Sequence, residues 1–416
     1  MRQVYKELVI FIMALAISMN ASGYDFEVNG IYYDYNPNDQ TAIVTYSYDK
    51  KYSGNIDIPD LVSYNGRTLP VLTIGHSAFG DCTELESVSL PNELTTIEWY
   101  AFARCTKISN IKIPETVTYI GRGAFQKCTA LYEIEIPVNI THIQDETFEG
   151  CTNLTKVSLP ANLEWIQGYA FYNCINLQSI RIPASTSHIT ESAFKGCENL
   201  ETIVFEDNTE KIRLTVNYSY GPFEGSKPKT IYLGRSVESF PYYTPSLDLS
   251  QTEIVSIGSN CNRYSCSFDK SNTISIIYSF HDNPERVSFS FSNQTYLNSI
   301  LYVPVGMKDR YLGAEGWKNF FNIQEMDVAD MWNGDGDPKN SIEQVRANTI
   351  LIQSYNGTLN IQGASDGTNI SIYSTSGMMV GSAKSVGTSA SIATSLRNGE
   401  IAIVKIGNKS VKVVMK

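Results

Sequence analysis

Long apolar runs are scarce in this 416-residue sequence, and the longest of them, Leu8–Met19, is too short to cross a membrane. A bilayer-spanning helix needs about 18 to 20 apolar residues in a row. Arg2 and Lys6 precede the run, and the small residues Ala21 to Gly23 follow it. This is the pattern of a secretory signal peptide, which we assign to residues 1–23. We therefore expect an exported chain whose mature form has no integral membrane segment.

Positive charge is also in short supply. Lys and Arg total 32 against 43 Asp and Glu, which gives a formal net charge of −11. A chain with this balance offers no electrostatic footprint for DNA or RNA. We expect no nucleic-acid partner.

Motifs that carry catalysis or bind metals are missing as well. The sequence holds no HExxH, nucleophile elbow or phosphate loop. His142 and His188 recur in one phase, but two repeats separate them, about 10 Å by strand spacing, so one metal ion cannot join them. No two acidic residues are singled out for glycoside chemistry. We expect no catalytic site, no metal and no cofactor.

One acidic segment has part of a calcium-loop pattern. Asn333, Asp335 and Asp337 have the spacing that opens such a loop, but the twelfth position is Gln344 instead of glutamate. The surrounding residues are polar and include Gly and Pro, which favours a linker over residues 327–347.

What the sequence has in quantity is self-similarity. Alanine or threonine, then phenylalanine, then two variable residues and a cysteine recur at an interval of 23 residues. Apolar columns follow the cysteine after three, six, eight and fifteen residues, and a proline follows after nine. The cysteines of the column are Cys82, Cys105, Cys128, Cys151, Cys174 and Cys197.

Each repeat unit predicts two short strands. Segments such as Ser87–Pro91 alternate polar and apolar residues, the period of a half-buried strand, and proline ends the strand because it has no N–H to donate. A second strand ends at the isoleucine column, and the Ala-Phe-x-x-Cys segment is expected to form a helical turn. One unit buries too few side chains to fold alone, whereas stacked units share one core. The sequence therefore predicts a β-rich repeat solenoid.

These residues resemble the BspA-type leucine-rich repeat, whose pattern is close to AFxxCxxLxxIxIPxxVxxIGxx. The likeness covers a regular array over residues 56–206, preceded by an N-terminal cap region over 24–55. Degenerate repeats and a C-terminal cap follow over 207–326, where Ser226 stands at the cysteine position. The last unit is similar to the closing unit of such arrays, which implies that its aromatic residues cover the open end of the core. These residues are Trp317, Phe320 and Phe321.

From Asn348 the sequence alternates as a β-sheet does, which predicts a small C-terminal β-sandwich over residues 348–416. This part is similar to the sorting or anchoring tails of secreted proteins from Gram-negative anaerobes. Ala402 stands where such tails carry tyrosine, and the segment has one extra residue. The residues that carry the likeness are Ile370 to Tyr373, Gly377, Leu396, Gly399, Val404, Lys405, Val411 and Lys412.

The repeat cysteines are not expected to form disulfides with one another. Neighbouring coils lie about 4.8 Å apart, and equivalent side chains point the same way instead of toward each other. Buried thiols that pack as small apolar groups are the favoured interpretation. Outside the regular repeat, Cys261 and Cys266 are the best-placed pair for a disulfide.

One column of the repeat suggests a binding surface. The residues directly before the isoleucine column are Thr96, Tyr119, His142, Trp165 and His188. Because side chains alternate faces along a strand, this column points outward. An outward line of aromatic residues suits sugar rings and peptides, so Tyr119, His142, Trp165 and His188 are the candidate ligand-binding residues. The alternative is that these rings only fill the surface between coils.

As a family, BspA-type proteins are implicated in adhesion to host proteins and to other cells. The resemblance therefore implies a non-catalytic binding module, secreted or displayed at a cell surface, with a Gram-negative outer surface as its expected location. Its implied partner is a host or microbial surface protein or glycan. Two alternatives stay open: an extracellular carbohydrate-directed enzyme that uses the repeats as a platform, and a structural surface-layer protein.

Overall fold

A computed structural model of the chain describes residues 23–215, 221–240, 247–264, 268–287, 289–335, 351–355, 357–407 and 409–415. The predicted signal peptide lies outside these residues, apart from Gly23. The chain divides into two compact units, which are described separately below. The first holds Met1–Lys229, Arg235–Leu249 and Tyr264–Cys266, and the second holds Thr230–Gly234, Ser250–Arg263 and Ser267–Lys416.

The first unit begins with antiparallel hairpins. β1 (Phe26–Val28), β2 (Ile31–Asn36) and β3 (Thr41–Thr45) form a meander, and β5 (Leu61–Tyr64) pairs with β6 (Arg67–Ile74). Both tight hairpins turn at an Asn-Gly pair with positive φ at each residue, which is the geometry that such pairs favour. β3 then pairs in parallel with β6, and this leads into the repeats.

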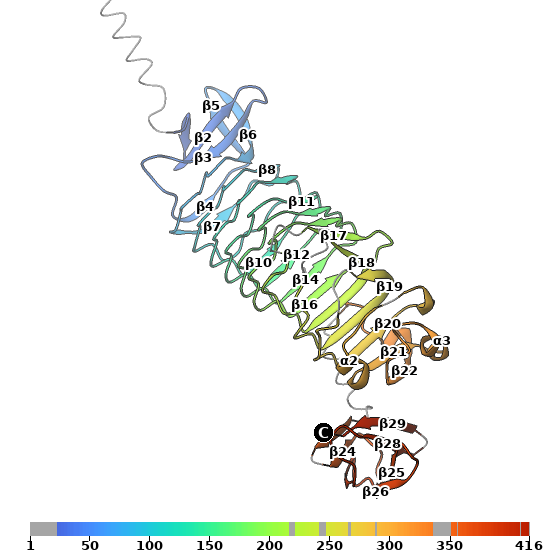
Figure 1. Cartoon of the computed structure of the whole chain (residues 1–416). Coiled ribbons are helices and arrows are strands. Elements are labelled where there is room, and N and C mark those ends of the chain that lie inside the picture. The colour runs from blue at the N-terminus through green and yellow to red at the C-terminus, as the bar shows by residue number, and fades with distance from the viewer. Residues whose placement is uncertain are drawn as a thin grey trace, which may run out of the picture. The chain divides into compact units, whose positions relative to one another are not determined.

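Parallel coils make up the rest of the first unit, and Figure 1 shows them stacked side by side from β7 to β16. Each regular coil is 23 residues long, and equivalent residues of neighbouring coils pair in register, as Thr96 does with Tyr119. The structure therefore confirms the predicted solenoid. Its strands are β4 (Gly54–Asp57), β7 (Leu85–Ser89), β8 (Thr96–Ile97), β9 (Tyr119–Ile120), β10 (Glu133–Glu135), β11 (His142–Ile143), β12 (Lys156–Ser158), β13 (Trp165–Ile166), β14 (Ser179–Ile182), β15 (His188–Ile189), β16 (Thr202–Phe205) and β17 (Ile212–Thr215).

The Ala-Phe-x-x-Cys segment is not the helical turn that its spacing predicts. It is a run of tight turns in which two residues of the coil adopt positive φ, Ser77 at 53° and Asp81 at 61°. Its backbone N–H groups alternate in direction. Cys82 N–H donates within the coil to the Phe79 carbonyl at 3.1 Å, whereas Phe79 N–H donates to Ala101 of the next coil at 2.8 Å. The left-handed residues make this alternation possible, so the turn joins neighbouring coils as the strands do.

The phenylalanine of each turn points into the core and stacks on its equivalents. Ring centroids lie between 4.9 and 5.5 Å apart, with interplanar angles of 10° or less. The ring of Tyr52, which lies between β3 and β4, is 4.5 Å from that of Phe79 and covers that end of the column. The stacked residues are Phe79, Phe102, Phe125, Phe148, Phe171, Phe194 and Phe223.

The repeat cysteines are buried and unbridged, as expected. They are also hydrogen-bond donors, which the sequence analysis did not foresee. The Cys128 thiol, for example, donates to the Phe102 carbonyl of the preceding coil at 3.1 Å. Where the repeat carries Ser226, the hydroxyl makes the equivalent bond to Phe194 at 3.4 Å. Burial raises the pKa of the Cys151 thiol to about 12, so the column stays protonated.

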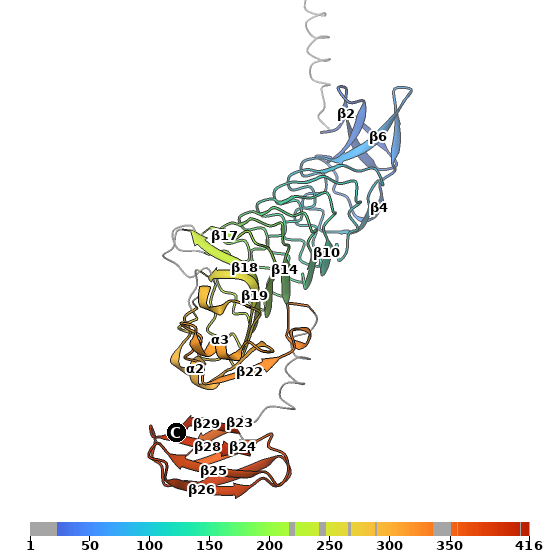
Figure 2. The same cartoon turned by 90° about the vertical axis from the view of Figure 1, so that its right-hand side faces the viewer.

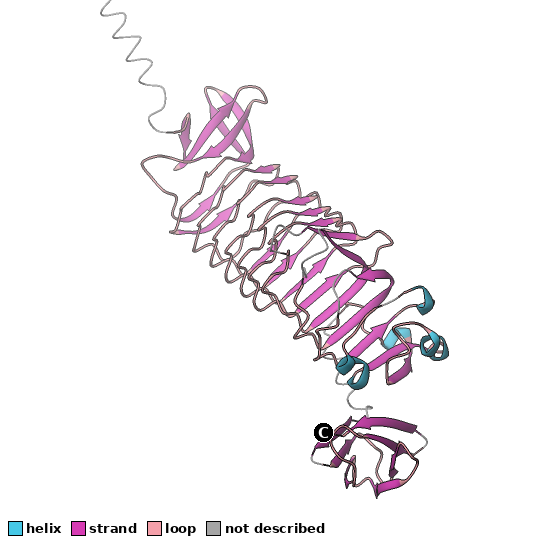
Figure 3. Cartoon of the chain, viewed as in Figure 1, coloured by secondary structure: helices cyan, strands magenta, loops and turns pink. Residues whose placement is uncertain are grey.

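The second unit begins with what we call the closing region, which is its described residues between 230 and 335. It contains the Thr230–Gly234 part of β18 (Thr230–Phe240), then β19 (Ile254–Tyr264), β20 (Ile276–Ser279), β21 (Ile300–Pro304) and β22 (Asn322–Met326). The strands β19 to β22 of this region pair in parallel with one another. Figure 3 shows short helices gathered beside these strands. They are η1 (Pro284–Arg286), α2 (Asn293–Asn298), α3 (Lys308–Gly313) and η2 (Val328–Asp330).

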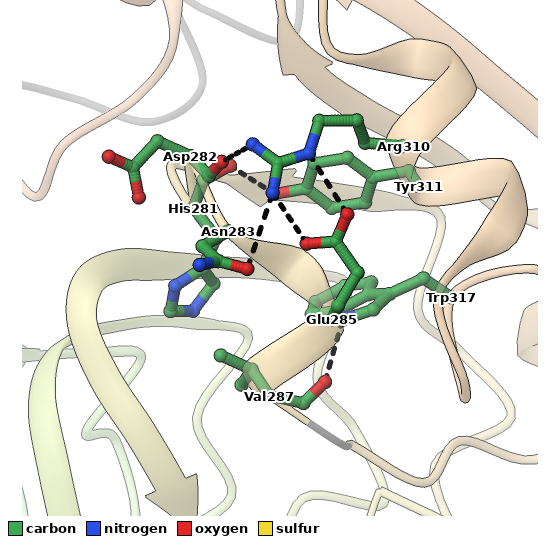
Figure 4. A network of polar contacts seen from close by, with 8 residues as sticks. All are labelled: His281, Asp282, Asn283, Glu285, Val287, Arg310, Tyr311 and Trp317. Atoms are coloured by element: carbon green, nitrogen blue, oxygen red, sulfur yellow. Dashed lines mark hydrogen bonds and ion pairs between the residues drawn. The ribbon is translucent and has the colours of Figure 1, made fainter.

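The aromatic residues that fill the closing region do not belong to a repeated column. Trp317 is fully buried, and its indole N–H donates to the Val287 carbonyl at 3.1 Å. Phe320 is buried as well, while Phe321 is partly exposed. Figure 4 shows the polar contacts above Trp317, where Arg310 donates to both carboxylate oxygens of Glu285, at 2.9 and 2.7 Å. This pair ties α3 to η1.

His281 is a buried titratable group of the same region. Its ring takes no part in the contacts drawn in Figure 4, although its backbone carbonyl accepts the Tyr311 hydroxyl at 3.0 Å. The ring Nε2 is buried without a hydrogen-bond partner among the described residues. Burial lowers the pKa of His281 to about 4, so the ring is neutral near pH 7.

The predicted linker (327–347) starts inside packed structure. Met331 and Trp332 are buried, and the Ser256 hydroxyl donates to the Trp332 carbonyl at 2.5 Å. The closing region therefore extends past the boundary placed at 327. Polar residues and glycines surround these two side chains and give the segment the composition of a linker. Composition alone therefore does not reveal that its first residues are packed.

The C-terminal domain consists of antiparallel strands whose arrangement can be followed in Figure 2. One sheet has the order β23-β24-β27 and the other β26-β25-β28-β29, as the predicted small β-sandwich requires. Leu359, Ile372 and Val404 are among the fully buried residues of its core. The strands are β23 (Leu351–Tyr355), β24 (Thr358–Gln362), β25 (Asn369–Ser374), β26 (Met379–Lys384), β27 (Ser389–Ala393), β28 (Ile401–Ile406) and β29 (Lys409–Val414).

Candidate ligand-binding surface

Four outward residues of successive coils, Tyr119, His142, Trp165 and His188, form what we call the aromatic stripe. Each begins a two-residue strand whose second residue is a buried isoleucine. The register pairs His142 with Trp165 and Trp165 with His188, and it pairs Tyr119 with Thr96 on the preceding coil. All four side chains are half-buried. The register is therefore continuous from His142 to His188, while Tyr119 ends the neighbouring sheet one coil earlier, and none of the four side chains is fully exposed.

The rings of His142, Trp165 and His188 lie face to face. The centroid of the Trp165 ring is 4.0 Å from that of His188 and 6.2 Å from that of His142, with interplanar angles of 10° and 7°. Both separations are in the range of direct ring contacts, so no sugar ring fits between these side chains. The stack fills part of the surface between coils, and it offers ring edges to a ligand instead of ring faces.

Hydrogen bonds fix the two histidine rings. Nδ1 of His142 lies 2.9 Å from the Thr141 hydroxyl, and Nδ1 of His188 lies 2.8 Å from the Ser187 hydroxyl. Nε2 of each histidine and Nε1 of Trp165 have no hydrogen-bond partner in the described part of the chain, and none of these atoms is sealed from solvent. Three successive coils therefore each present one ring nitrogen that has no partner among the described residues.

Arg213 extends the aromatic stripe by one coil. β17 pairs in parallel with β15 so that Arg213 lies opposite His188, and the arginine is exposed. Burial and then the nearby Arg213 charge lower the pKa of the His188 imidazole. The sequence analysis missed Arg213 because 25 residues, not 23, separate it from His188. The strand-like alternation of residues 211–216 was the signal available.

Trp99 lies beside the other end of the aromatic stripe. Its indole N–H donates to the Tyr119 hydroxyl at 2.7 Å, yet half of the residue (50%) remains exposed. Gly121 on the next coil makes room for it, because a Cβ there would lie 2.5 Å from Cδ1 of Trp99. The sequence analysis missed this residue because it lies in the turn and not in the outward column. A tryptophan in that exposed turn was the signal available.

Metal ligands do not come together in groups of three or more among the described residues. In the calcium-loop pattern, Asn333 accepts the Asp335 backbone N–H at 3.1 Å, while Asp337 lies outside the described residues. Cys261 is buried, and Cys266, like Asp337, lies outside the described residues. The disulfide between these two cysteines stays a prediction.

Comparison with known proteins identifies the repeat. Residues 41–149 and 129–244 match the BspA type leucine rich repeat region, with six copies. No curated protein matches the sequence. None of the helices in the described ranges is long and apolar enough to span a bilayer.

Two bacterial proteins of known structure are similar to this chain. A leucine-rich repeat protein from Bacteroides ovatus is 17% identical over 73% of this chain and 100% of its own, with a TM-score of 0.37. A leucine rich cell surface protein from Faecalibacterium prausnitzii is 19% identical over 75% of this chain and 98% of its own, with a TM-score of 0.38.

Proposed function

Because the repeat array of this chain belongs to the BspA-type leucine-rich repeat family, we propose that the protein is a non-catalytic binding module. It is secreted or displayed at a cell surface, and it adheres to a protein or glycan partner through the aromatic stripe. The observation that carries this proposal is the register, which sets rings of successive coils in one half-exposed line. A long partner can therefore contact several coils at once.

The aromatic stripe is ordered before a partner arrives. Trp165 is held between His142 and His188, and each histidine is fixed through Nδ1 by a neighbouring hydroxyl. A surface that is already fixed loses less conformational entropy on binding. Aromatic rings with a polar edge are also the side chains that concentrate binding energy at interfaces. Neither the enzyme nor the surface-layer alternative is favoured by an observation of this kind.

The test is capture of host and microbial surface components by the full mature chain and by a Tyr119→Ala/Trp165→Ala variant. We expect the variant to lose most of the captured material. Tyr132→Ala is the matched control, because Tyr132 is a 45% exposed aromatic residue of the same array outside the stripe. Far-UV circular dichroism checks the fold, and Trp165→Phe keeps a ring in the stack if the double variant unfolds. Full capture by a folded double variant would exclude the stripe and point to residues 208–298.

A further inference from the structure

We propose that the ligand of the aromatic stripe is an acidic oligosaccharide, oriented with a sugar ring on Trp99 and a carboxylate on Arg213. This inference rests on the function proposed above, and it names the chemical class of the partner and its direction along the array. Three features carry it: an exposed aromatic residue, ring nitrogens without hydrogen-bond partners in the described part of the chain, and an arginine that likewise has none there.

The exposed aromatic residue is Trp99. The Trp165 ring is covered by its histidine neighbours, whereas no ring of a described residue stacks on Trp99, which is 50% exposed. The bond from its N–H to the Tyr119 hydroxyl holds the indole at the stripe. An exposed and fixed indole is suited to the apolar face of a sugar ring.

The row of nitrogens calls for a ligand rich in acceptors. Trp165 Nε1 is a donor in every state, and an imidazole nitrogen donates whenever it carries its proton. These atoms come from His142, Trp165 and His188, at intervals of about 4.8 Å along the array. Hydroxyl and carboxylate oxygens, repeated along a sugar chain, are acceptors of the required kind.

Arg213 supplies an unneutralised positive charge. Among the described arginines of the first unit, it alone has a guanidinium without a hydrogen-bond or ion-pair partner in the described residues. Glu238 lies opposite it in β18, but Lys211 Nζ binds that carboxylate at 2.8 Å. The other arginines are paired as follows: Arg67 with Tyr35, Arg104 with Asp81, Arg122 with Glu146, Arg181 with Glu206, and Arg235 with the carbonyls of Pro183 and Ala184.

An exposed arginine beside ring N–H groups favours a carboxylate, because its planar fork binds both carboxylate oxygens. The net charge of the whole chain is −11, so a general attraction for acidic molecules is not expected. Affinity for an anion would have to come from this local arrangement. Four coil steps separate Tyr119 from Arg213, about 20 Å, which a short oligosaccharide spans.

A peptide is a poorer fit to the same surface. Extended peptides are commonly recognised through main-chain hydrogen bonds at the edge of a sheet. The stripe crosses a ladder in which backbone groups already bond to a neighbouring coil, as Gln167 N–H does to the Ile143 carbonyl of the preceding coil at 2.9 Å. The protein must therefore recognise its ligand through side chains. The hydroxyl and carboxylate groups on sugar rings are suited to such contacts.

The test is titration calorimetry of the full mature chain with oligogalacturonate, the same oligosaccharide after reduction of its carboxyl groups, and poly-glutamate. We expect oligogalacturonate to bind, and reduction of its carboxyl groups to weaken binding about tenfold or more. Arg213→Gln should lower the affinity for oligogalacturonate by a similar factor and bring it close to that of the reduced sugar. Trp99→Ala should lower the affinity for both oligosaccharides by the same factor. Lys112→Gln, which removes an exposed charge outside the stripe, should change nothing.

Three outcomes would overturn the inference. Equal affinity for the reduced sugar would show that the carboxylate does not contribute to binding. Equal or tighter binding of poly-glutamate would show that the ligand is an acidic peptide and not a glycan. Absence of binding to oligogalacturonate, and to a hyaluronan oligosaccharide as a second uronate probe, would reject the ligand class. That last result would leave the proposed function intact if capture of surface components still depends on Tyr119 and Trp165.

Discussion

In the regular array (56–206), buried polar groups find their partners one coil away through contacts that recur, whereas in the closing region they depend on single residues. The thiols from Cys105 to Cys197 each donate to a phenylalanine carbonyl at 3.1 to 3.2 Å. In the closing region the side chains of Tyr278, His281 and Trp332 each bury a polar atom without a partner among the described residues. Ser192 does so in the regular array.

This difference indicates which changes destabilise each part of the molecule. A repeat spreads its stability over many equivalent contacts, so the cost of a substitution depends on the column it falls in. The closing region has no such redundancy, because Trp317, His281 and Arg310 each make contacts that occur once. We expect the array to respond to loss of volume and the closing region to respond also to pH.

The largest expected effect is in the array. Ile134 is 3% exposed, and its replacement by alanine removes buried methyl groups and leaves a cavity, at a cost of about 2–5 kcal/mol of unfolding free energy. Ile180→Ala, in the same column, should cost a similar amount. Lys112→Ala, at an exposed position of the array, should stay within about 0.5 kcal/mol. Denaturant unfolding followed by circular dichroism measures all three, and equal losses at Ile134 and Lys112 would refute the strand register.

The next effect is the pH response of the closing region. The folded-state pKa of His281, about 4, lies below the value of an exposed imidazole, about 6.5. The neutral ring therefore stabilises the fold in full above pH 6.5, and this contribution is lost as the pH falls toward 4. The loss amounts to about 3 kcal/mol. Hydrogen exchange of residues 276–304 between pH 7 and 4 should show it in the native protein and not in His281→Leu. Parallel pH profiles for the two proteins would contradict the prediction.

The smallest effect tests the thiol bonds of the array. Cys128→Ser keeps a donor for the Phe102 carbonyl, as Ser226 does naturally for Phe194, whereas Cys128→Ala removes it. We expect the alanine variant to be less stable than the serine variant by about 1 kcal/mol, the net contribution of one hydrogen bond. Thermal unfolding compares the two variants. A serine variant that is the less stable of the two would show that the thiol acts only as an apolar group.

Much of this fold could be predicted from the sequence. The 23-residue interval sets the coil length, and the phenylalanine, cysteine and isoleucine columns identify the inward face, because a solenoid repeats its environment as it repeats its residues. The alternation after Asn348 likewise predicts a separate β-domain. The outward phase of Tyr119, His142 and Trp165 also follows from side-chain alternation along a strand.

Tertiary structure decided the rest. The turn at Ser77–Cys82 has the spacing of a helical turn, but hydrogen bonds to the next coil select left-handed residues instead. Coil spacing brings the rings of His142, Trp165 and His188 face to face, so a ligand meets their edges. Arg213 joins the stripe across an insertion that breaks the sequence interval, and Trp99 reaches it from a turn across Gly121. A sequence pattern fixes which residues share an environment, whereas contacts between unlike positions depend on where neighbouring coils place them.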